Sequence, residues 1–325
     1  MLKLLFVAML AVLGGLRSTS ADAQPWPVRP ITIVVPFPAG GPTDALTRIM
    51  AERLSSLLAQ PVVIENVTGA AGTIAVGRVV RAAPDGYTLV MGNLSTHVIN
   101  GAVYALPYDL VKDFDPIALV GGNPQLIVAR QDLPAGSLGE LVAWLKASGE
   151  KASQGTAGVG SPAHIGGVLF QAATGTRFQF IPYRGAAPIM QDLIAGQIDF
   201  TFAQTANALP QVRAGKIKVY AVTSARRLAE APEIPTATES GLPGFEISIW
   251  HGLWAPKGTP QSVIARLDAA VIETLADEKV TQRLAALGVD IPPRPQQTPE
   301  GLRVYHAGEI ARWWPIIKAA NLKPE

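Results

Sequence analysis

The sequence contains no cysteine. A disulfide framework, a thiolate nucleophile and a cysteine-ligated metal are therefore excluded. The four histidines are scattered, and none has the spacing of a metal-binding motif. The Gly-x-Ser-x-Gly elbow that carries the nucleophile of many hydrolases is also absent. Because the usual patterns of a metal site and of a nucleophilic enzyme are missing, we expect no metal ion, no cofactor and no catalysis.

Charged residues are few, at 16% of the chain, and the formal net charge is only +2. Nucleic-acid binding needs a clustered basic face, and 27 basic against 25 acidic residues is too even a balance to suggest one. The same balance argues against a polybasic membrane anchor. After the N-terminus, no apolar run reaches the ~18 residues needed to cross a bilayer. We expect no nucleic-acid partner and no later membrane span.

The first 23 residues have the pattern of a secretory signal peptide. Lys3 precedes an apolar run, Leu4 to Leu13, that is too short to span a bilayer. Small and polar residues follow and end in Ala21-Asp22-Ala23, an A-x-A cleavage site. The alternative is a buried N-terminal strand or helix. We expect export, with cleavage between Ala23 and Gln24.

Short apolar strands alternate with helical segments along the rest of the chain. Strand–helix–strand repeats of this size build βαβ units around a parallel sheet, so the pattern predicts an α/β fold. The predicted strands are 31–35, 61–66, 87–92, 117–120, 125–129, 153–156, 178–181, 198–202, 217–222 and 245–254. The predicted helices begin near residue 43 and continue with 73–83, 137–147, 161–174, 186–195, 206–214, 260–275, 278–287 and 299–318.

Two places have the character of crossings between domains. One is the pair of strands separated by residues 121–124, and the other is the strand 245–254 after a long loop. A chain that leaves and returns makes one domain from both ends of the sequence. We expect a signal peptide at 1–23, a first domain of 24–124 plus 248–325, and a second domain of 125–247.

The turn after the first strand is a candidate anion site. Ala39, Gly40 and Gly41 let backbone N–H groups approach a ligand closely. Pro42 suits the first turn of a helix, and Thr43 and Asp44 can cap or orient that turn. The free N–H groups and the helix dipole favour a negative charge there. An ordinary tight strand–helix turn would have the same composition.

A second turn, residues 155–164, repeats this design with glycines, Ser161 at the predicted N-cap and a following proline. Gly158-x-Gly160-x-x-Ala163 within it imitates a dinucleotide fingerprint, but the next strand ends in Pro182-Tyr183-Arg184-Gly185 without the required acid. Ser161 and His164 could suggest a hydrolase, yet no third group is indicated to orient a base. A cap serine and a cleft or core histidine are the simpler interpretation.

Two further segments could add contacts on the same side of the predicted cleft. Arg184, in the third strand–helix turn, could pair with a carboxylate, or could be a solvated surface residue. Ser95 and Thr96 follow the third strand and could supply hydroxyl groups.

Several motifs occur in order along the mature chain. They are Trp26-Pro27-x-Arg29-Pro30-Ile31-Thr32, Val35-Pro36-Phe37-Pro38-Ala39-Gly40-Gly41-Pro42-x-Asp44, Glu65-Asn66-x-x-Gly69-Ala70-x-Gly72, Pro84-Asp85-Gly86-Tyr87-Thr88-Leu89, Asp113-Phe114-x-Pro116-Ile117, Gly160-Ser161-Pro162-x-His164, Pro182-Tyr183-Arg184-Gly185-x-Ala187-Pro188 and Gly196-Gln197-Ile198-Asp199. Together they resemble the Bug family, the TctC-like substrate-binding proteins of tripartite tricarboxylate transporters.

The resemblance implies a periplasmic, two-domain α/β clamshell of the periplasmic-binding-protein type, with mixed, mostly parallel sheets. It implies a monomer that delivers its ligand to the membrane permease subunits of a tripartite tricarboxylate transporter. The implied ligand is a small carboxylate, namely a di- or tricarboxylate, an acidic amino acid, or an aromatic or cyclic carboxylate.

By the same resemblance, the ligand's carboxylate lies between the loops Phe37–Asp44 and Gly158–His164. Many relatives place an aspartate where this chain has Gln204, which argues against a specific expectation of an amino-acid ligand. The predicted ligand-binding residues are Phe37, Ala39, Gly40, Gly41, Thr43, Asp44, Ser95, Thr96, Gly160, Ser161, Ala163, His164, Tyr183, Arg184, Gly185 and Gln204.

The predicted mechanism is capture by closure, in which the ligand contacts both domains only when the cleft shuts. Two alternatives stay open at this point: a ligand sensor that reports to a receptor, and an exported hydrolase or lyase that uses the same cleft.

The signal-peptide interpretation predicts the mature N-terminus. Mass spectrometry of the protein from a periplasmic fraction should give a chain that begins at Gln24, because cleavage follows the A-x-A site. A mature chain that retains the apolar run from Leu4 would contradict export by this route.

Overall fold

The computed structural model describes residues 26–319. The predicted signal peptide, 1–23, and its cleavage site lie outside the described residues. Within residues 26–319, no helix is both long and apolar enough to cross a bilayer.

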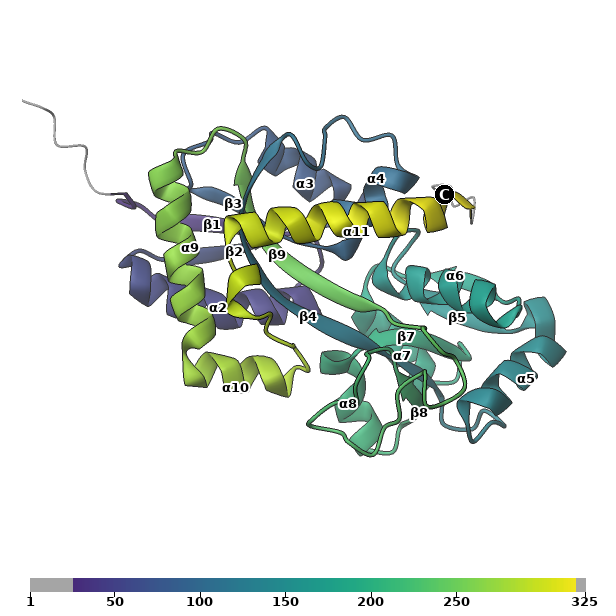
Figure 1. Ribbon diagram of the computed structural model, residues 1–325. Helices are drawn as coiled ribbons and strands as arrows, with labels where there is room; N and C mark the ends of the chain where they lie inside the picture. Colours follow the sequence, from purple (N-terminus) through teal and green to yellow (C-terminus); the bar gives the residue numbers. More distant parts are fainter. Residues whose placement is uncertain (1–25, 320–325) are drawn as a thin grey trace, which may run out of the picture.

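The described strands form one continuous sheet in the order β2-β1-β3-β9-β4-β7-β5-β6, and β8 also pairs with β4. Long strands β4 and β9 run diagonally through the molecule and join its two halves (Figure 1). The strands are β1 (Ile31–Val35), β2 (Val62–Asn66), β3 (Thr88–Asn93), β4 (Phe114–Arg130), β5 (Ser153–Thr156), β6 (Gln179–Pro182), β7 (Phe200–Gln204), β8 (Ile217–Val222) and β9 (Ser248–Pro256).

Helices cover both halves of this sheet. Figure 1 shows α2, α3, α9 and α10 around the half that contains β1, and α5 to α8 around the half that contains β5. The helices are α2 (Pro42–Leu58), α3 (Thr73–Val80), α4 (Asn100–Val103), α5 (Leu138–Ser148), α6 (Pro162–Thr174), α7 (Ala186–Ile194), α8 (Thr205–Arg213), α9 (Gln261–Ala276), α10 (Glu278–Ala286) and α11 (Pro299–Ala319). All of the predicted helices are present, but α4 and the π-helical turn Ser95–Ile99 before it were not predicted.

The sheet is mixed, as predicted. β1 pairs in parallel with β2 and β3, and β5 pairs in parallel with β6 and β7. The pairings of β3 with β9, and of β4 with β7, β8 and β9, are antiparallel. Antiparallel pairing therefore has a larger share than the strand–helix alternation suggested, because β4 and β9 connect the halves.

The prediction of two strands separated by residues 121–124 was wrong, since β4 is one strand of 17 residues. The two glycines permit close approach where a break was expected. A Cβ on Gly121 would lie 2.5 Å from Val289 Cγ1, and a Cβ on Gly122 would lie 2.7 Å from Ser248 Oγ. Two register irregularities with β9, between Pro116 and Ala118 and between Leu119 and Gly121, let the strand bend just before this segment without ending.

Thr223 forms hydrogen bonds with β4 and with the residue just before β9, at the point where the chain passes between the two halves. Gln125 N–H donates to Thr223 Oγ1 (2.8 Å), and Thr223 N–H donates to Gln125 O (2.8 Å). The Thr223 hydroxyl also donates to Ile247 O (2.7 Å), and Ile247 N–H donates to Thr223 O (2.9 Å). One buried residue thus ties the outgoing strand β4 to the chain that returns just before β9.

Apolar side chains fill the space between sheet and helices. Leu46, Met50 and Leu54 on one face of α2 are almost fully buried beside Ile31 and Ile33 of β1. Burial of each such side chain contributes about 1.5–3 kcal/mol relative to exposure. This packing fixes α2, and with it the loop that precedes it.

All four histidines are buried and uncharged. His97 stacks on Trp254 with ring centroids 3.9 Å apart, and His306 Nε2 contacts His97 O. Burial lowers the pKa of His164 and of His251 to about 4, and it also lowers the pKa values of His97 and His306. The folded protein therefore keeps these imidazoles neutral. In the unfolded chain the same side chains would take up a proton below the ordinary histidine pKa of about 6.5.

This burial predicts loss of stability in acid. Between about pH 6.5 and pH 4 the unfolded chain binds more protons than the folded one, so the free energy of unfolding falls as pH falls. At pH 5 the effect should be on the order of 2 kcal/mol for each of His164 and His251. Burial also raises the pKa of Asp268, to about 6, and that of Asp290. These two groups oppose the effect of the four histidines on stability. Melting temperatures should drop steadily from pH 7.5 to 5; a constant or rising value would contradict the assignment.

Candidate functional site

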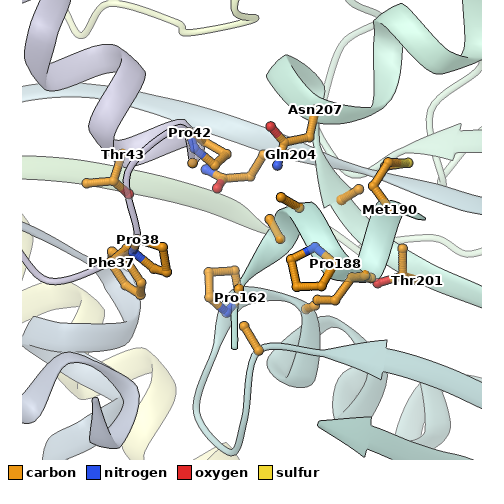
Figure 2. A pocket seen from close by; sticks show the side chains of 18 of the residues that line it. Phe37, Pro38, Pro42, Thr43, Pro162, Pro188, Met190, Thr201, Gln204 and Asn207 are labelled. Carbon is orange, nitrogen blue, oxygen red and sulfur yellow. The ribbon is translucent and has the colours of Figure 1, made fainter. Parts of the chain in front are cut away.

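A cavity of about 390 Å³ lies between the two halves of the molecule. Its volume falls in the range of small-molecule sites. Figure 2 shows Phe37, Pro38, Pro42 and Thr43 on one side of it, and Pro188, Met190 and Gln204 on the other. The loops that were predicted to share a crevice, one before α2 and one before α6, do line the same cavity.

Four helices begin at this cavity. The first-turn residues that line it include Thr43 of α2, Ala163 of α6, Ala187 of α7 and Asn207 of α8. The topology explains three of the four: β5, β6 and β7 are parallel, so the helices that follow them start at one edge of the sheet. The first N–H groups of a helix have no partner inside the helix and carry the positive end of its dipole.

The first loop is organised by Asp44, which is buried. Its carboxylate accepts hydrogen bonds from Gly40 N–H (2.9 Å), Arg48 Nε (2.9 Å) and Asn66 Nδ2 (3.0 Å). Burial by itself would raise the pKa of Asp44, but the hydrogen bonds from Arg48, Gly40 and Asn66 outweigh it and hold the pKa below its usual value. Asn66 Nδ2 also donates to Phe37 O (3.0 Å), so two side chains fix the path of the loop.

The glycine amides have partners within this loop. Gly40 N–H is engaged by Asp44, and Gly41 N–H donates to Pro38 O (3.3 Å). Gly40 has a φ of +79°, a conformation that favours glycine. The amides of Thr43 and Asp44, in the first turn of α2, are left as the donors at the end of the helix.

The second loop has its own internal scaffold. Ser161 Oγ accepts hydrogen bonds from Ala157 N–H (3.1 Å) and His164 N–H (3.4 Å), which caps α6. Gly160 N–H donates to His164 Nδ1 (3.3 Å), which requires an unprotonated nitrogen, in agreement with the pKa of about 4. Ser161 and the His164 ring thus bond to the backbone, an arrangement that does not resemble a nucleophile with its base.

The predicted site residues divide into two equal groups. Those that line the cavity are Phe37, Ala39, Gly41, Thr43, Ala163, Arg184, Gly185 and Gln204. Those outside its lining are Gly40, Asp44, Ser95, Thr96, Gly160, Ser161, His164 and Tyr183. Most of the second group shape the loops rather than face the cavity.

Thr96 and Tyr183, which were predicted to bind the ligand, form hydrogen bonds within the protein instead. Thr96 Oγ1 accepts from Asn93 N–H (2.9 Å) and Thr96 N–H donates to Asn93 Oδ1 (3.1 Å), so this hydroxyl closes a turn. Asn93 lines the cavity in its place. The Tyr183 hydroxyl donates to Asp192 Oδ2 (2.7 Å), which ties β6 to α7.

Sequence reasoning missed several cavity residues. The polar ones are Thr68, Asn93, Gln125, Thr201 and Asn207, and the apolar ones include Ile189, Met190 and Phe202. Gln125 had a visible signal, because it is a polar residue that opens the apolar strand segment 125–129. Asn93 and Asn207 had no such signal in the sequence, because polar residues are common at the end of a strand and in the first turn of a helix.

The charge on the side chains that line the cavity is positive. Among its described lining residues, Arg184 is the one charged side chain, and it is exposed. No group of His, Asp and Glu within residues 26–319 could hold a metal ion. The cavity therefore offers a cation and several helix N-termini to a ligand, and no carboxylate.

Comparison with known proteins supports a binding protein. Residues 46–322 match the model of the tripartite tricarboxylate transporter family receptor. The periplasmic binding protein BugD is 40% identical, with a TM-score of 0.86 over 92% of this chain and 100% of that one. MatC of Rhodopseudomonas palustris, solved with bound malate, is 39% identical, with a TM-score of 0.86 over 90% and 100% of the two chains.

A third solved structure is Rpa4515 of R. palustris with adipate, which is 34% identical, with a TM-score of 0.88 over 92% of this chain and all of that one. These neighbours confirm the predicted fold class; one is a periplasmic binding protein, and the other two were solved with malate and adipate. With its family match over most of its length, the chain belongs to the tripartite tricarboxylate transporter receptor family, the Bug-type periplasmic solute-binding proteins.

Proposed function

We propose that the protein captures a small carboxylate in the cavity between its halves and presents it to the permease of a tripartite tricarboxylate-type transporter, without chemical turnover. The observation that carries this proposal is the convergence of four helix N-termini on a cavity whose described lining has no acid. Each helix end contributes about 0.3–2 kcal/mol to binding of an anion. Malate and adipate, bound by two relatives, are small carboxylates of the size that a cavity of about 390 Å³ accepts.

We propose further that residues 24–124 with 248–325, and residues 125–247, are the two domains of a clamshell. Contacts between the two halves support a closed arrangement. The Tyr104 hydroxyl donates to Val159 O (3.0 Å), and a Cβ on Gly185 would lie 3.1 Å from Pro38 Cγ. A ligand that touches both loops binds the closed arrangement more tightly than an open one. To shift the protein from mostly open to mostly closed, this difference in binding free energy must be about 5.5 kcal/mol.

Gly41→Trp tests the site. Gly41 lines the cavity with a φ of −78°, and an added Cβ would meet only Pro38 O, at 3.3 Å. The indole should fill the cavity and abolish binding, while the melting temperature without ligand changes little. The measurement is isothermal calorimetry with the carboxylate that gives wild type its largest thermal shift in a library that includes malate and adipate.

Gly139→Trp is the matched control, because Gly139 lies on α5 with open space around its Cβ position and is remote from the cavity lining. It should bind as wild type does. Unchanged affinity in Gly41→Trp, or no thermal shift with any carboxylate in wild type, would count against the proposed function.

Ser161→Ala tests whether the cap of α6 positions the site. Loss of the hydroxyl leaves Ala157 N–H and His164 N–H without their acceptor, so the second loop should loosen and affinity should fall several-fold. Ser137→Ala removes an equivalent cap from α5, where Ser137 Oγ accepts from Glu140 N–H (3.2 Å). Both variants should lose about 1 kcal/mol of stability, but only Ser161→Ala should bind more weakly. Equal affinities, or a catalytic rate that Ser161→Ala removes, would contradict this role.

A further inference from the structure

Two glutamines form a pair on the wall of the cavity. Gln125 of β4 and Gln204 of β7 are direct partners in the antiparallel ladder, and both line the cavity. Side chains at directly opposed positions of such a ladder lie on the same face, about 5 Å apart at Cβ. The structure therefore places two glutamine side chains next to each other on the cavity wall.

These carboxamides are buried and lack partners. Gln125 is fully buried, and neither its Oε1 nor its Nε2 has a hydrogen bond within the described residues. Gln204 is 9% exposed, and its Nε2 is likewise buried without a partner. Buried polar atoms are paired in the great majority of cases, because an unpaired one is costly.

The position of Gln125 is fixed by its backbone alone. Its N–H donates to Thr223 Oγ1 and its carbonyl accepts from Thr223 N–H. Gln154, on neighbouring β5, differs, since its Nε2 donates to Ala163 O at 2.7 Å and only its Oε1 lacks a partner. The Gln125 side chain has no such bond and lines the cavity, so its carboxamide is available to a group that enters there.

The surroundings restrict the charge of that group. The one charged lining residue, Arg184, belongs to a corner that packs on the first loop through Gly185 and Pro38. The rest of the described lining is uncharged and includes Asn207, which lies beside Gln204 (Figure 2), and the apolar Ile189, Met190 and Phe202. A carboxylate there would leave the amide oxygens unpaired, and an ammonium would find no carboxylate. The N-terminus of α8 favours an anion, but it supplies no donor to the Gln125 oxygen.

We infer that the ligand is a monocarboxylate whose second polar group is uncharged and both donates and accepts hydrogen bonds, as a carboxamide does, and that Gln125 and Gln204 select this group. The inference rests on the proposed function, carboxylate capture in the same cavity. It assigns the carboxylate to the N-termini of α2 and α6, and the neutral group to the glutamine pair beside the N-terminus of α8.

Isosteric ligand pairs test this selection by calorimetry. The pairs are succinamate with succinate, glutaramate with glutarate, adipamate with adipate, and 4-carbamoylbenzoate with terephthalate. Within the best-fitting pair, wild type should bind the monoamide at least ten-fold more tightly than the diacid, because only the amide satisfies both donors and acceptors. A diacid that binds as tightly as, or more tightly than, its monoamide in every pair would overturn the inference.

The variant Gln204→Glu is a second test of the role of the glutamine pair. The added carboxylate should weaken binding of the preferred monoamide by at least ten-fold and should improve binding of the ω-amino acid of the same length. Gln191→Glu is the control, since Gln191 is exposed on α7 and outside the cavity lining; it should bind like wild type. An equal loss in both variants would overturn the inference.

The results separate the two proposals. If diacids or other carboxylates bind but no monoamide is preferred, carboxylate capture stands and the role of the glutamine pair fails. If no carboxylate in the pairs or the library binds, both proposals fail.

Discussion

The first turn of every α-helix leaves backbone N–H groups without partners, and the structure around the cavity depends on this constraint. Four helices begin there, so their unpaired donors and positive dipole ends are concentrated on a small volume. Parallel pairing of β5, β6 and β7 produces three of these starts at one sheet edge. The preference for an anion is thus a property of the topology before any side chain is considered.

Several side chains near the cavity form hydrogen bonds with backbone groups of the two loops. Asp44 and Asn66 hold the first loop, and Ser161 with neutral His164 holds the second. Half of the described cavity lining is glycine, alanine and proline, whose small side chains leave the backbone at the helix starts accessible to a ligand. Such a site is preorganised, because its donors are positioned before a ligand arrives and little conformational entropy is lost on binding.

Local patterns in the sequence predicted most of the fold. Alternating strands and helices, the Ser137 cap, and the two glycine-bearing turns depend on neighbouring residues, so they could be inferred from short windows. The continuity of β4 could not, because the close approach of Gly121 to Val289 involves residues far apart in the chain. The pairing of Gln125 with Gln204 is likewise a matter of register between distant strands. Asp44 was predicted to cap or orient its turn and to bind the ligand, but its burial and its hydrogen bond from Gly40 N–H could be seen only in the structure.

Thr223 binds both strands that pass between the halves, and this has a mechanical consequence. Two separate linkers would let one half slide or twist against the other in several directions. Strands that are clamped to one residue, and that pair with each other from Pro124 and Ser248 onward, must bend as a unit. Any change in the relative position of the halves must therefore deform this hydrogen-bonded ribbon as a whole, rather than two independent connections.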